Sequence, residues 1–364
     1  MTKPVAWHLC SNRWNSAITE YALSLARCTS QLGFRTVMSG LPNSAANRRA
    51  EGYHLEVAPL SDFSLLGLPK FLSLASRLRP ELVFVSGGPE TVLTRFMASG
   101  KVMRFRGQAV DPKRTALSLR HRLAHGHVIH TLVPSPSLAR QLDPLTKGGG
   151  GIRVLELGID DQKFFYTSKP RRQPFEVVIL GRLDPVKGHE PFIATFAAAQ
   201  KKLSIPIKLH VVGEPANISV AHLEQVAKDN GLKVGEDITF TAERLSNLAE
   251  FLSTSTLGVI PSLDSEVICR VTQEFLLCGV PVLVSGVGSL GDCLYDGAGK
   301  SFAGLSDKAR VKQLIEAIEQ AASEPEEDRQ FRAEKAKARF SLEAMAQNLR
   351  ALLNELNVVN PTEA

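Results

Sequence analysis

Two glutamates, Glu266 and Glu274, are separated by eight positions in the segment SEVICRVTQEFLLCGVPVLVSG. Residues 268–278 alternate apolar and polar at helical spacing, and Gly279 and Pro281 end the pattern, which predicts a short helix followed by an apolar strand. If most of the interval is helical, the carboxylates lie roughly 12 Å apart along the axis. That distance excludes a paired-acid hydrolase centre, whose carboxyl groups lie within about 5–9.5 Å. It suits an elongated ligand with hydroxyl groups at both ends, although two solvated acids on a helix surface give the same pattern.

Two cations, Arg182 and Lys187, lie in a second motif upstream, FEVVILGRLDPVKGHEPFI. Val177–Leu180 predicts a strand, and Lys187-Gly188 opens a helix after a glycine turn. Anions bind where a strand of an α/β sheet leads through a loop into a helix, because the helix amides point to that place. We therefore predict that the two cations bind a diphosphate. The alternative is that both cap a surface loop.

Taken together, these motifs resemble the signature of retaining glycosyltransferase family 4, within the glycosyl transferases group 1, in its bacterial envelope and lipopolysaccharide type. The signature is present here as Gly181-Arg182-Leu183, Lys187-Gly188, Glu266, Glu274 and Gly279-Val280-Pro281-Val282. Residues 155–165, LELGIDDQKFF, also resemble the segment that closes the first domain in this family. The resemblance covers nearly all of the second half of the chain and is faint over the first half.

The resemblance implies the GT-B fold, which is an α/β architecture of two Rossmann-like domains facing each other across a cleft. We expect an N-terminal, acceptor-side domain over residues 1–165 and a nucleotide-sugar-binding domain over residues 166–340. Residues 341–364 are expected to form a helix that packs back on the N-terminal domain. The length of 364 residues agrees with two domains of about 100–200 residues each.

The resemblance also assigns roles. Arg182 and Lys187 would hold the nucleotide diphosphate and neutralise it as the glycosidic bond breaks. Glu266 would bind hydroxyl groups of the transferred sugar, and Glu274 would bind those of the ribose. Other donor contacts are expected from Gly181, Gly213, Arg244 and the backbone amides of Val267, Ile268 and Cys269. No metal or other cofactor is expected, because the two cations replace a divalent ion and no Asp-x-Asp motif occurs.

The first half departs from the family pattern. Many members have a Gly-Gly turn after the first strand, whereas this chain has Ser11-Asn12-Arg13-Trp14-Asn15-Ser16. Asn15 and Ser16 are candidates for donor contact, and a polar turn or a helix N-cap is the alternative. In place of the usual active-site histidine the chain has KVMRFRGQAVDP, so Arg104, Arg106 and Gly107 become candidates for contact with the acceptor or the donor sugar.

Charge is distributed unevenly along the chain. Residues 1–150 contain 19 Lys and Arg against 8 Asp and Glu, out of totals of 43 and 37. A basic first half implies a negatively charged partner, which is an anionic membrane surface or an anionic glycan or glycolipid acceptor. A solvated basic face is the third possibility. Nucleic acid is not expected, since no basic motif interleaved with aromatic residues occurs.

Alternating strand and helix patterns predict a parallel sheet in each domain, with residues 42–52 as a loop. The five scattered cysteines predict reduced thiols of a cytosolic protein. No signal peptide and no membrane-spanning run is recognised.

The expected function is a hexosyltransferase-type glycosyltransferase that acts at the inner face of the cytoplasmic membrane. It would move a sugar from a nucleotide sugar, a UDP-sugar in preference to a GDP-sugar, to lipopolysaccharide or another cell-envelope glycan. The alternatives are a catalytically silent nucleotide-sugar-binding scaffold and a GT-B-type nucleotide-sugar epimerase.

Overall fold

The computed structural model describes residues 3–108, 125–142, 151–243, 245–264 and 266–357. The chain divides into two compact units. Unit 1 comprises Met1–Gly158 with Phe340–Ala364, and unit 2 comprises Ile159–Arg339. The division therefore comes earlier than the boundary expected after residue 165. The segment that follows Arg339 belongs to unit 1.

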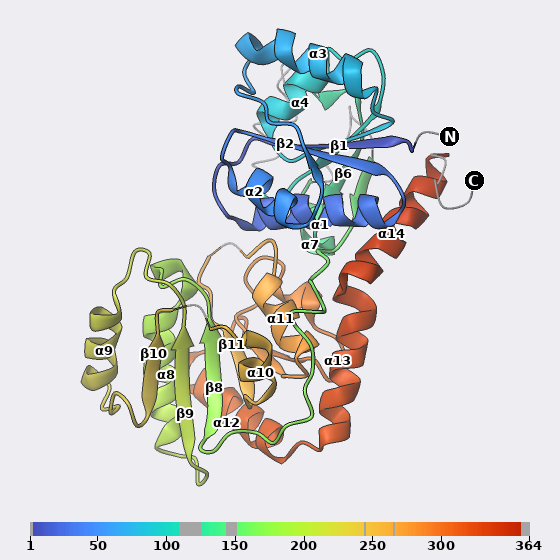
Figure 1. Cartoon of the computed structure of the whole chain (residues 1–364). Helices are drawn as coiled ribbons and strands as arrows, with labels where there is room; N and C mark the ends of the chain where they lie inside the picture. The colour runs from blue at the N-terminus through green and yellow to red at the C-terminus, as the bar shows by residue number, and fades with distance from the viewer. Residues whose placement is uncertain (1–2, 109–124, 143–150, 244, 265, 358–364) are drawn as a thin grey trace. The chain divides into compact units, whose positions relative to one another are not determined.

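Unit 1 is built on a parallel sheet. Its described strands follow the order β3-β2-β1-β4-β5-β6-β7, and Figure 1 labels β1, β2 and β6 of this sheet. They are β1 (Val5–Cys10), β2 (Arg35–Gly40), β3 (Glu56–Val57), β4 (Leu82–Val85), β5 (Lys101–Phe105), β6 (Val128–Val133) and β7 (Gly151–Val154). The helices between them are α1 (Ala17–Gln31), α2 (Ala45–Gly52), η1 (Leu65–Gly67), α3 (Leu68–Leu78), α4 (Gly88–Thr94) and α7 (Pro136–Leu142), and α14 (Leu342–Glu355) is added from the end of the chain.

Apolar strands and helix faces explain this arrangement. The Trp7 and Phe71 rings stack with centroids 5.1 Å apart, and Trp7 Nε1 donates to Ser39 Oγ at 2.8 Å, so the indole is both buried and paired. Helix α14 packs against α1 (Figure 1), where Cys28 Sγ donates to the Leu342 carbonyl at 3.6 Å. The final helix therefore completes the core of unit 1.

Unit 2 repeats the plan. Its described strands are all parallel and follow the order β10-β9-β8-β11-β12-β13. They are β8 (Phe175–Leu180), β9 (Ile207–Val212), β10 (Ile238–Thr241), β11 (Leu257–Ile260), β12 (Val282–Val284) and β13 (Gly299–Ser301). The helices are η3 (Pro185–Lys187), α8 (His189–Gln200), α9 (Val220–Asp229), α10 (Leu248–Ser253), α11 (Arg270–Leu277), η4 (Leu290–Cys293), α12 (Asp307–Ser323) and α13 (Glu326–Phe340).

Strand order marks where a ligand binds in each sheet. In the sheet, β8 lies between β9, the next strand along the chain, and β11, which comes later. Loops that leave such a pair diverge, which opens a crevice outside the carboxyl ends of the strands. The same reversal occurs in unit 1 between β1 and β4. The two strand reversals therefore mark the expected ligand-binding edge of each sheet.

One sequence expectation is wrong. Residues 42–52 were expected to form a loop, but Ala45–Gly52 forms α2, with Ser44 Oγ accepting from Asn47 N as its N-cap. Ala46 and Ala50 pack into a small cluster with Met38 and Leu23, so burial of small side chains supports a helix that lacks an apolar stripe. Among the described residues, no helix is long and apolar enough to cross a membrane.

Candidate active site

Glycines bring two strand ends of unit 2 into contact. Gly181 follows β8 and Gly213 follows β9, and the Gly181 N–H donates to the Val212 carbonyl at 2.9 Å. A Cβ added at Gly213 would lie 1.8 Å from the Gly181 carbonyl oxygen, so no larger residue fits. Gly181 itself has a φ of 155°, which favours glycine. The structure therefore places these two predicted donor-contact residues side by side.

The loop after β8 is held in shape by Asp184. Its carboxylate accepts from the Val186 N–H at 3.2 Å and from Asn217 Nδ2 at 2.7 Å. These bonds, with the Val186 N–H first, and the nearby charges of Arg182 and Lys187 hold the pKa of Asp184 below its usual range. The side chain of Arg182 is exposed. Asp184 was not predicted from the sequence, although an Asp directly before a short helix is a known capping signal.

His189, the first residue of α8, fixes the backbone of Arg182. Its Nε2 donates to the Arg182 carbonyl at 3.0 Å. Burial lowers the pKa of His189 and favours the neutral ring, which donates from one nitrogen. Gly188 has a φ of 72°, and a Cβ there would lie 2.1 Å from the Pro261 carbonyl oxygen. The loop after β8 therefore approaches the loop after β11 at a point that only glycine permits.

The loops after β8 and β11 carry the central interaction of the site. Leu263 N donates to the Val186 carbonyl at 2.8 Å. Lys187 Nζ forms an ion pair with Glu266 Oε1, and Ser262 Oγ donates to the same carboxylate oxygen at 2.6 Å. The Lys187 and Glu266 side chains are 27% and 13% exposed. Two residues that were expected to bind different parts of a donor are thus partners of each other in this structure.

The segment between the two glutamates is only partly helical. Helix α11 begins at Arg270, with Cys269 at the N-cap, so Glu266 lies in the preceding loop. The Glu266 carbonyl accepts from the Ser289 N–H at 2.7 Å and from Cys269 Sγ at 3.7 Å, which fixes the loop. The separation of roughly 12 Å expected along one helix axis therefore does not apply, because it assumed about 1.5 Å of rise per residue throughout.

Glu274 lies within α11 and is almost fully buried. Its side chain is 2% exposed, and its Oε1 pairs with Arg270 Nε at 2.8 Å. Val267, Ile268 and Cys269 precede the helix; Ile268 and Cys269 are buried, and Val267 is half-buried. A hydrogen bond with the Cys293 thiol, and then burial, raise the pKa of the Cys269 thiol. Arg244 lies outside the described residues.

In unit 1, Asn15 and Ser16 take structural roles. Ser16 Oγ accepts from Asn12 Nδ2 at 2.6 Å and caps α1 through the Thr19 N–H. Asn15 Oδ1 accepts from Arg49 Nη1 at 2.9 Å. The helix-cap interpretation therefore describes Ser16, and a donor contact by either residue stays a prediction.

Arg104, near the end of β5, is half-buried and bonds His125 at 3.0 Å through Nη1. Burial, and then the charge of Arg106, lower the pKa of Arg104 to about 10. Arg106 N donates to the Leu132 carbonyl at 2.8 Å, and Gly107 follows. These candidates lie at the carboxyl end of β5, on the edge of the sheet where the loops after β1 and β4 also begin.

Sequence reasoning missed Glu90 in this region. Its carboxylate accepts from the Ser11 N–H, next to the strand reversal of unit 1, and its Oε2 is buried without a hydrogen-bond partner in the described structure. Burial is the main cause that raises its pKa. A Cβ at Gly87 would lie 2.3 Å from Glu90 Oε2, so the glycine at this position makes room for the acid. Among the described residues, no group of three or more His, Cys, Asp or Glu is placed to hold a metal ion.

Comparison with known proteins gives a family match within the second unit. Residues 160–339 match the family model "Glycosyl transferases group 1". No curated protein sequence matches the chain. Among solved structures, HepE from Anabaena in complex with UDP and glucose is 17% identical, with a TM-score of 0.72 over 97% of this chain and 100% of that one.

Two further structures have the same fold. Sucrose-phosphate synthase from Thermosynechococcus elongatus is 16% identical, with a TM-score of 0.74 over 97% of this chain and 99% of that one. The lipopolysaccharide outer core galactosyltransferase WaaB, in its apo form, is 12% identical, with a TM-score of 0.74 over the same shares. The two parallel α/β units of this chain thus have the GT-B fold.

Proposed function

We propose that this chain, a glycosyltransferase with a group 1 domain over residues 160–339, is a retaining enzyme of family 4. It transfers a sugar from a nucleotide sugar, a UDP-sugar by preference, to lipopolysaccharide or another cell-envelope glycan. HepE was solved with UDP and with UDP-glucose, which supports the choice of donor nucleotide. The WaaB structure supports the choice of acceptor class.

The observation that carries this proposal is the Lys187–Glu266 ion pair at the strand reversal of unit 2. A lysine ammonium paired with a carboxylate is already positioned for a negative charge. We infer that the donor diphosphate replaces Glu266 as the partner of Lys187, with Arg182 as the second cation. Glu266 is then released to accept hydrogen bonds from the sugar hydroxyl groups. Without a donor, the ion pair therefore holds the side chains of Lys187 and Glu266 in the positions from which they would bind the donor.

Once the donor diphosphate has replaced Glu266 as the partner of Lys187, the glycosidic bond of the donor can break. The bond between the anomeric carbon and the diphosphate oxygen breaks, and a bond to the acceptor oxygen forms on the same face of the sugar. The acceptor proton goes to the departing phosphate oxygen. Negative charge grows on the diphosphate in the transition state, where one preorganised cation contributes about 3 kcal/mol. Glu274 binds the ribose, and no metal is required, because Arg182 and Lys187 supply the positive charge.

Unit 1 would provide acceptor binding and attachment to a membrane. Arg104 and Arg106 are half-buried cations at the carboxyl edge of its sheet, which suits an anionic glycan. On its surface, Leu66 is 90% exposed and Trp14 is 76% exposed, and Lys70 lies in the helix that follows Leu66. Exposed apolar side chains near basic ones favour an anionic bilayer surface. We propose the cytoplasmic membrane face as the location.

The alternative is a nucleotide-sugar-binding scaffold without activity. It is favoured by the engagement of Asn15 and Ser16 in local structure, since these occupy the place of a family phosphate turn. Incubation of the full chain with UDP-sugars alone and with envelope glycan acceptors separates the two. Transfer supports the proposal, whereas UDP binding without transfer or hydrolysis supports the scaffold. Conversion of the donor sugar without acceptor would instead indicate an epimerase.

A further inference from the structure

We propose that unit 2 contains a second ligand site, separate from the Lys187–Glu266 site, that binds a small molecule with an aromatic ring and one anionic group. The site is a cavity of about 360 Å³ between α8, α12 and the loops after β11, β12 and β13. Pockets that bind small molecules in proteins have volumes of roughly 300–1,000 Å³. The cavity is therefore large enough for one aromatic acid.

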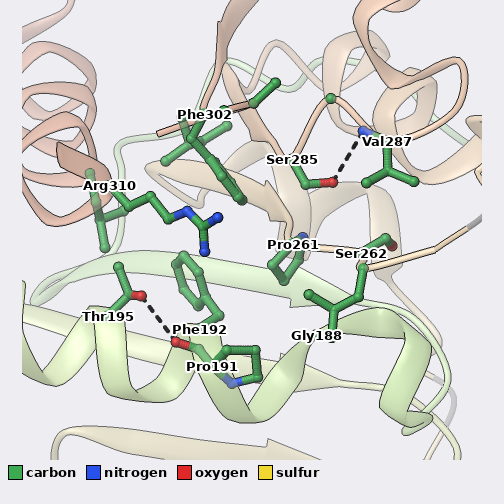
Figure 2. Close-up of a pocket in the computed structure, with 16 residues that line it drawn as sticks. Gly188, Pro191, Phe192, Thr195, Pro261, Ser262, Ser285, Val287, Phe302 and Arg310 are labelled. Carbon is green, nitrogen blue, oxygen red and sulfur yellow. Dashed lines mark hydrogen bonds between the residues drawn. The ribbon is translucent and has the colours of Figure 1, made fainter. Parts of the chain in front are cut away.

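The walls of the cavity are mainly apolar and aromatic. Phe192 and Pro191 come from α8, Phe302 follows β13, and Pro261 and Leu263 follow β11. Figure 2 shows the rings of Phe302 and Phe192 with the end of the Arg310 side chain between them in this view. Aromatic side chains in the wall favour a flat, apolar ligand, because stacked and edge-on rings attract beyond the burial of area.

Arg310 supplies the charge. Among the described residues that line the cavity it alone is charged, and Figure 2 shows its side chain reaching from α12 toward the space between Phe192 and Phe302. The guanidinium carbon lies 5.8 Å from the centroid of the Phe302 ring. Its Nε is buried and has no hydrogen-bond partner in the described structure. An unpaired, buried donor of a cation is satisfied best by an anion, since a carboxylate accepts from a guanidinium in two places.

The contacts that Arg310 does make are weak. Its Nη1 lies 3.5 Å from Asp307 Oδ1, and the Asp307 side chain is 96% exposed. An ion pair of that length and exposure contributes little. The guanidinium is therefore available for a ligand without loss of a strong internal bond.

This cavity is distinct from the donor-binding residues proposed above. None of Arg182, Lys187, Glu266 and Glu274 is among its lining residues. Its wall nevertheless includes Gly188 and Ser262, which adjoin Lys187 and bond Glu266. Binding of a small molecule in this cavity can be measured whether or not the enzyme is active.

The test is calorimetric titration of the full chain with 4-phenylbutyrate and with its neutral analogue 4-phenylbutanamide. The expected result is that the carboxylate binds at least tenfold more tightly than the amide. Thr195→Trp fills the cavity from α8 and should weaken carboxylate binding at least tenfold. Ala194→Trp is the control, because Ala194 is exposed on the same helix and does not line the cavity.

A second pair of variants tests the charge. Arg310→Gln should abolish the preference for the carboxylate over the amide, while Lys312→Gln, an exposed cation on the same helix, should preserve it. Should Thr195→Trp unfold, Ala303→Phe blocks the cavity from the loop after β13. The proposal is overturned if the wild-type chain binds neither probe or does not distinguish them. Equal carboxylate affinity in the wild-type and blocked chains also overturns it.

Discussion

Lys187 Nζ forms an ion pair with Glu266 Oε1, although the two residues are 79 positions apart in the chain. Strands β8 and β11 are neighbours in the sheet, so the loops that follow them start side by side. Each partner is half-buried or more and is held by its own loop, Glu266 additionally by Ser262. The pair therefore joins the two motifs that the sequence presents separately.

Replacement of Lys187 by alanine should lower kcat/KM for sugar transfer about 100-fold or more, because about 3 kcal/mol of charge stabilisation is lost in the transition state. Steady-state kinetics with a UDP-sugar and an envelope acceptor measures the effect. Lys202→Ala is the matched control, since Lys202 is exposed beyond the end of α8. Unchanged turnover in Lys187→Ala would contradict the assigned role.

Glu274→Gln should raise KM for the nucleotide sugar about tenfold or more, because a neutral amide accepts more weakly from ribose hydroxyl groups than a carboxylate. Removal of the charge also leaves Nε of the partly exposed Arg270 with a weaker acceptor. Donor KM and the melting temperature are measured together. An unchanged KM with a lowered melting temperature would assign Glu274 to structure alone.

Gly213→Ala should destabilise unit 2 by about 1–3 kcal/mol, as other overpacked sites do, because its Cβ would lie 1.8 Å from the Gly181 carbonyl oxygen. For a unit of this size the melting temperature falls by roughly 2–4 °C per kcal/mol. Gly291→Ala is the control, since a Cβ there meets nothing within 4 Å. Equal melting temperatures of the two variants would show that the strand ends move apart without cost.

The stability of unit 1 should depend on His8 at acidic pH. Burial lowers the pKa of His8 from 6.5 to about 3, so the folded ring stays neutral while the unfolded chain binds a proton below pH 6.5. The contribution to stability is complete above pH 6.5 and is lost by about 1.4 kcal/mol per pH unit as the pH falls toward 3. Urea unfolding at pH 6.5 and 5 should show a steeper loss for the wild-type chain than for His8→Gln. Parallel losses would mean that another group controls acid stability.

Membrane attachment should depend on Leu66, which is 90% exposed in unit 1. Leu66→Glu should weaken sedimentation with phosphatidylglycerol vesicles, because it replaces an apolar contact with a charge that the bilayer repels. Phe331→Glu, at a 56% exposed position of unit 2, is the control. Equal sedimentation of both variants, or equal binding to phosphatidylcholine vesicles, would remove Leu66 from the proposed membrane surface.

The sequence was sufficient to predict the elements whose apolar pattern is strong. Residues 68–78 form α3, where Phe71, Leu74 and Leu78 recur at helical spacing on one buried face. In contrast, α2 escaped prediction because it buries alanines, and β13 escaped because Gly299–Ser301 is a short edge strand without apolar residues. Side-chain composition carries little signal in such elements.

Local sequence patterns select candidate site residues, whereas the contacts between those residues depend on the fold. Gly181, Lys187 and Glu266 follow from local patterns after strands, whereas the Lys187–Glu266 pair depends on which strands are neighbours. Glu90 illustrates the same limit in unit 1, since its burial beside Ser11 depends on β4 lying next to β1. Strand order is a property of the whole sheet and leaves no mark at a single residue.

Both tryptophans of the chain belong to unit 1, Trp7 enclosed in its core and Trp14 at its surface. Indole emission therefore reports on one unit only, and the other is spectroscopically silent at that wavelength. Comparison of emission with circular dichroism during heating would show whether the two units melt together or in sequence. Tryptophan emission of the unmodified chain therefore distinguishes the unfolding of unit 1 from that of unit 2.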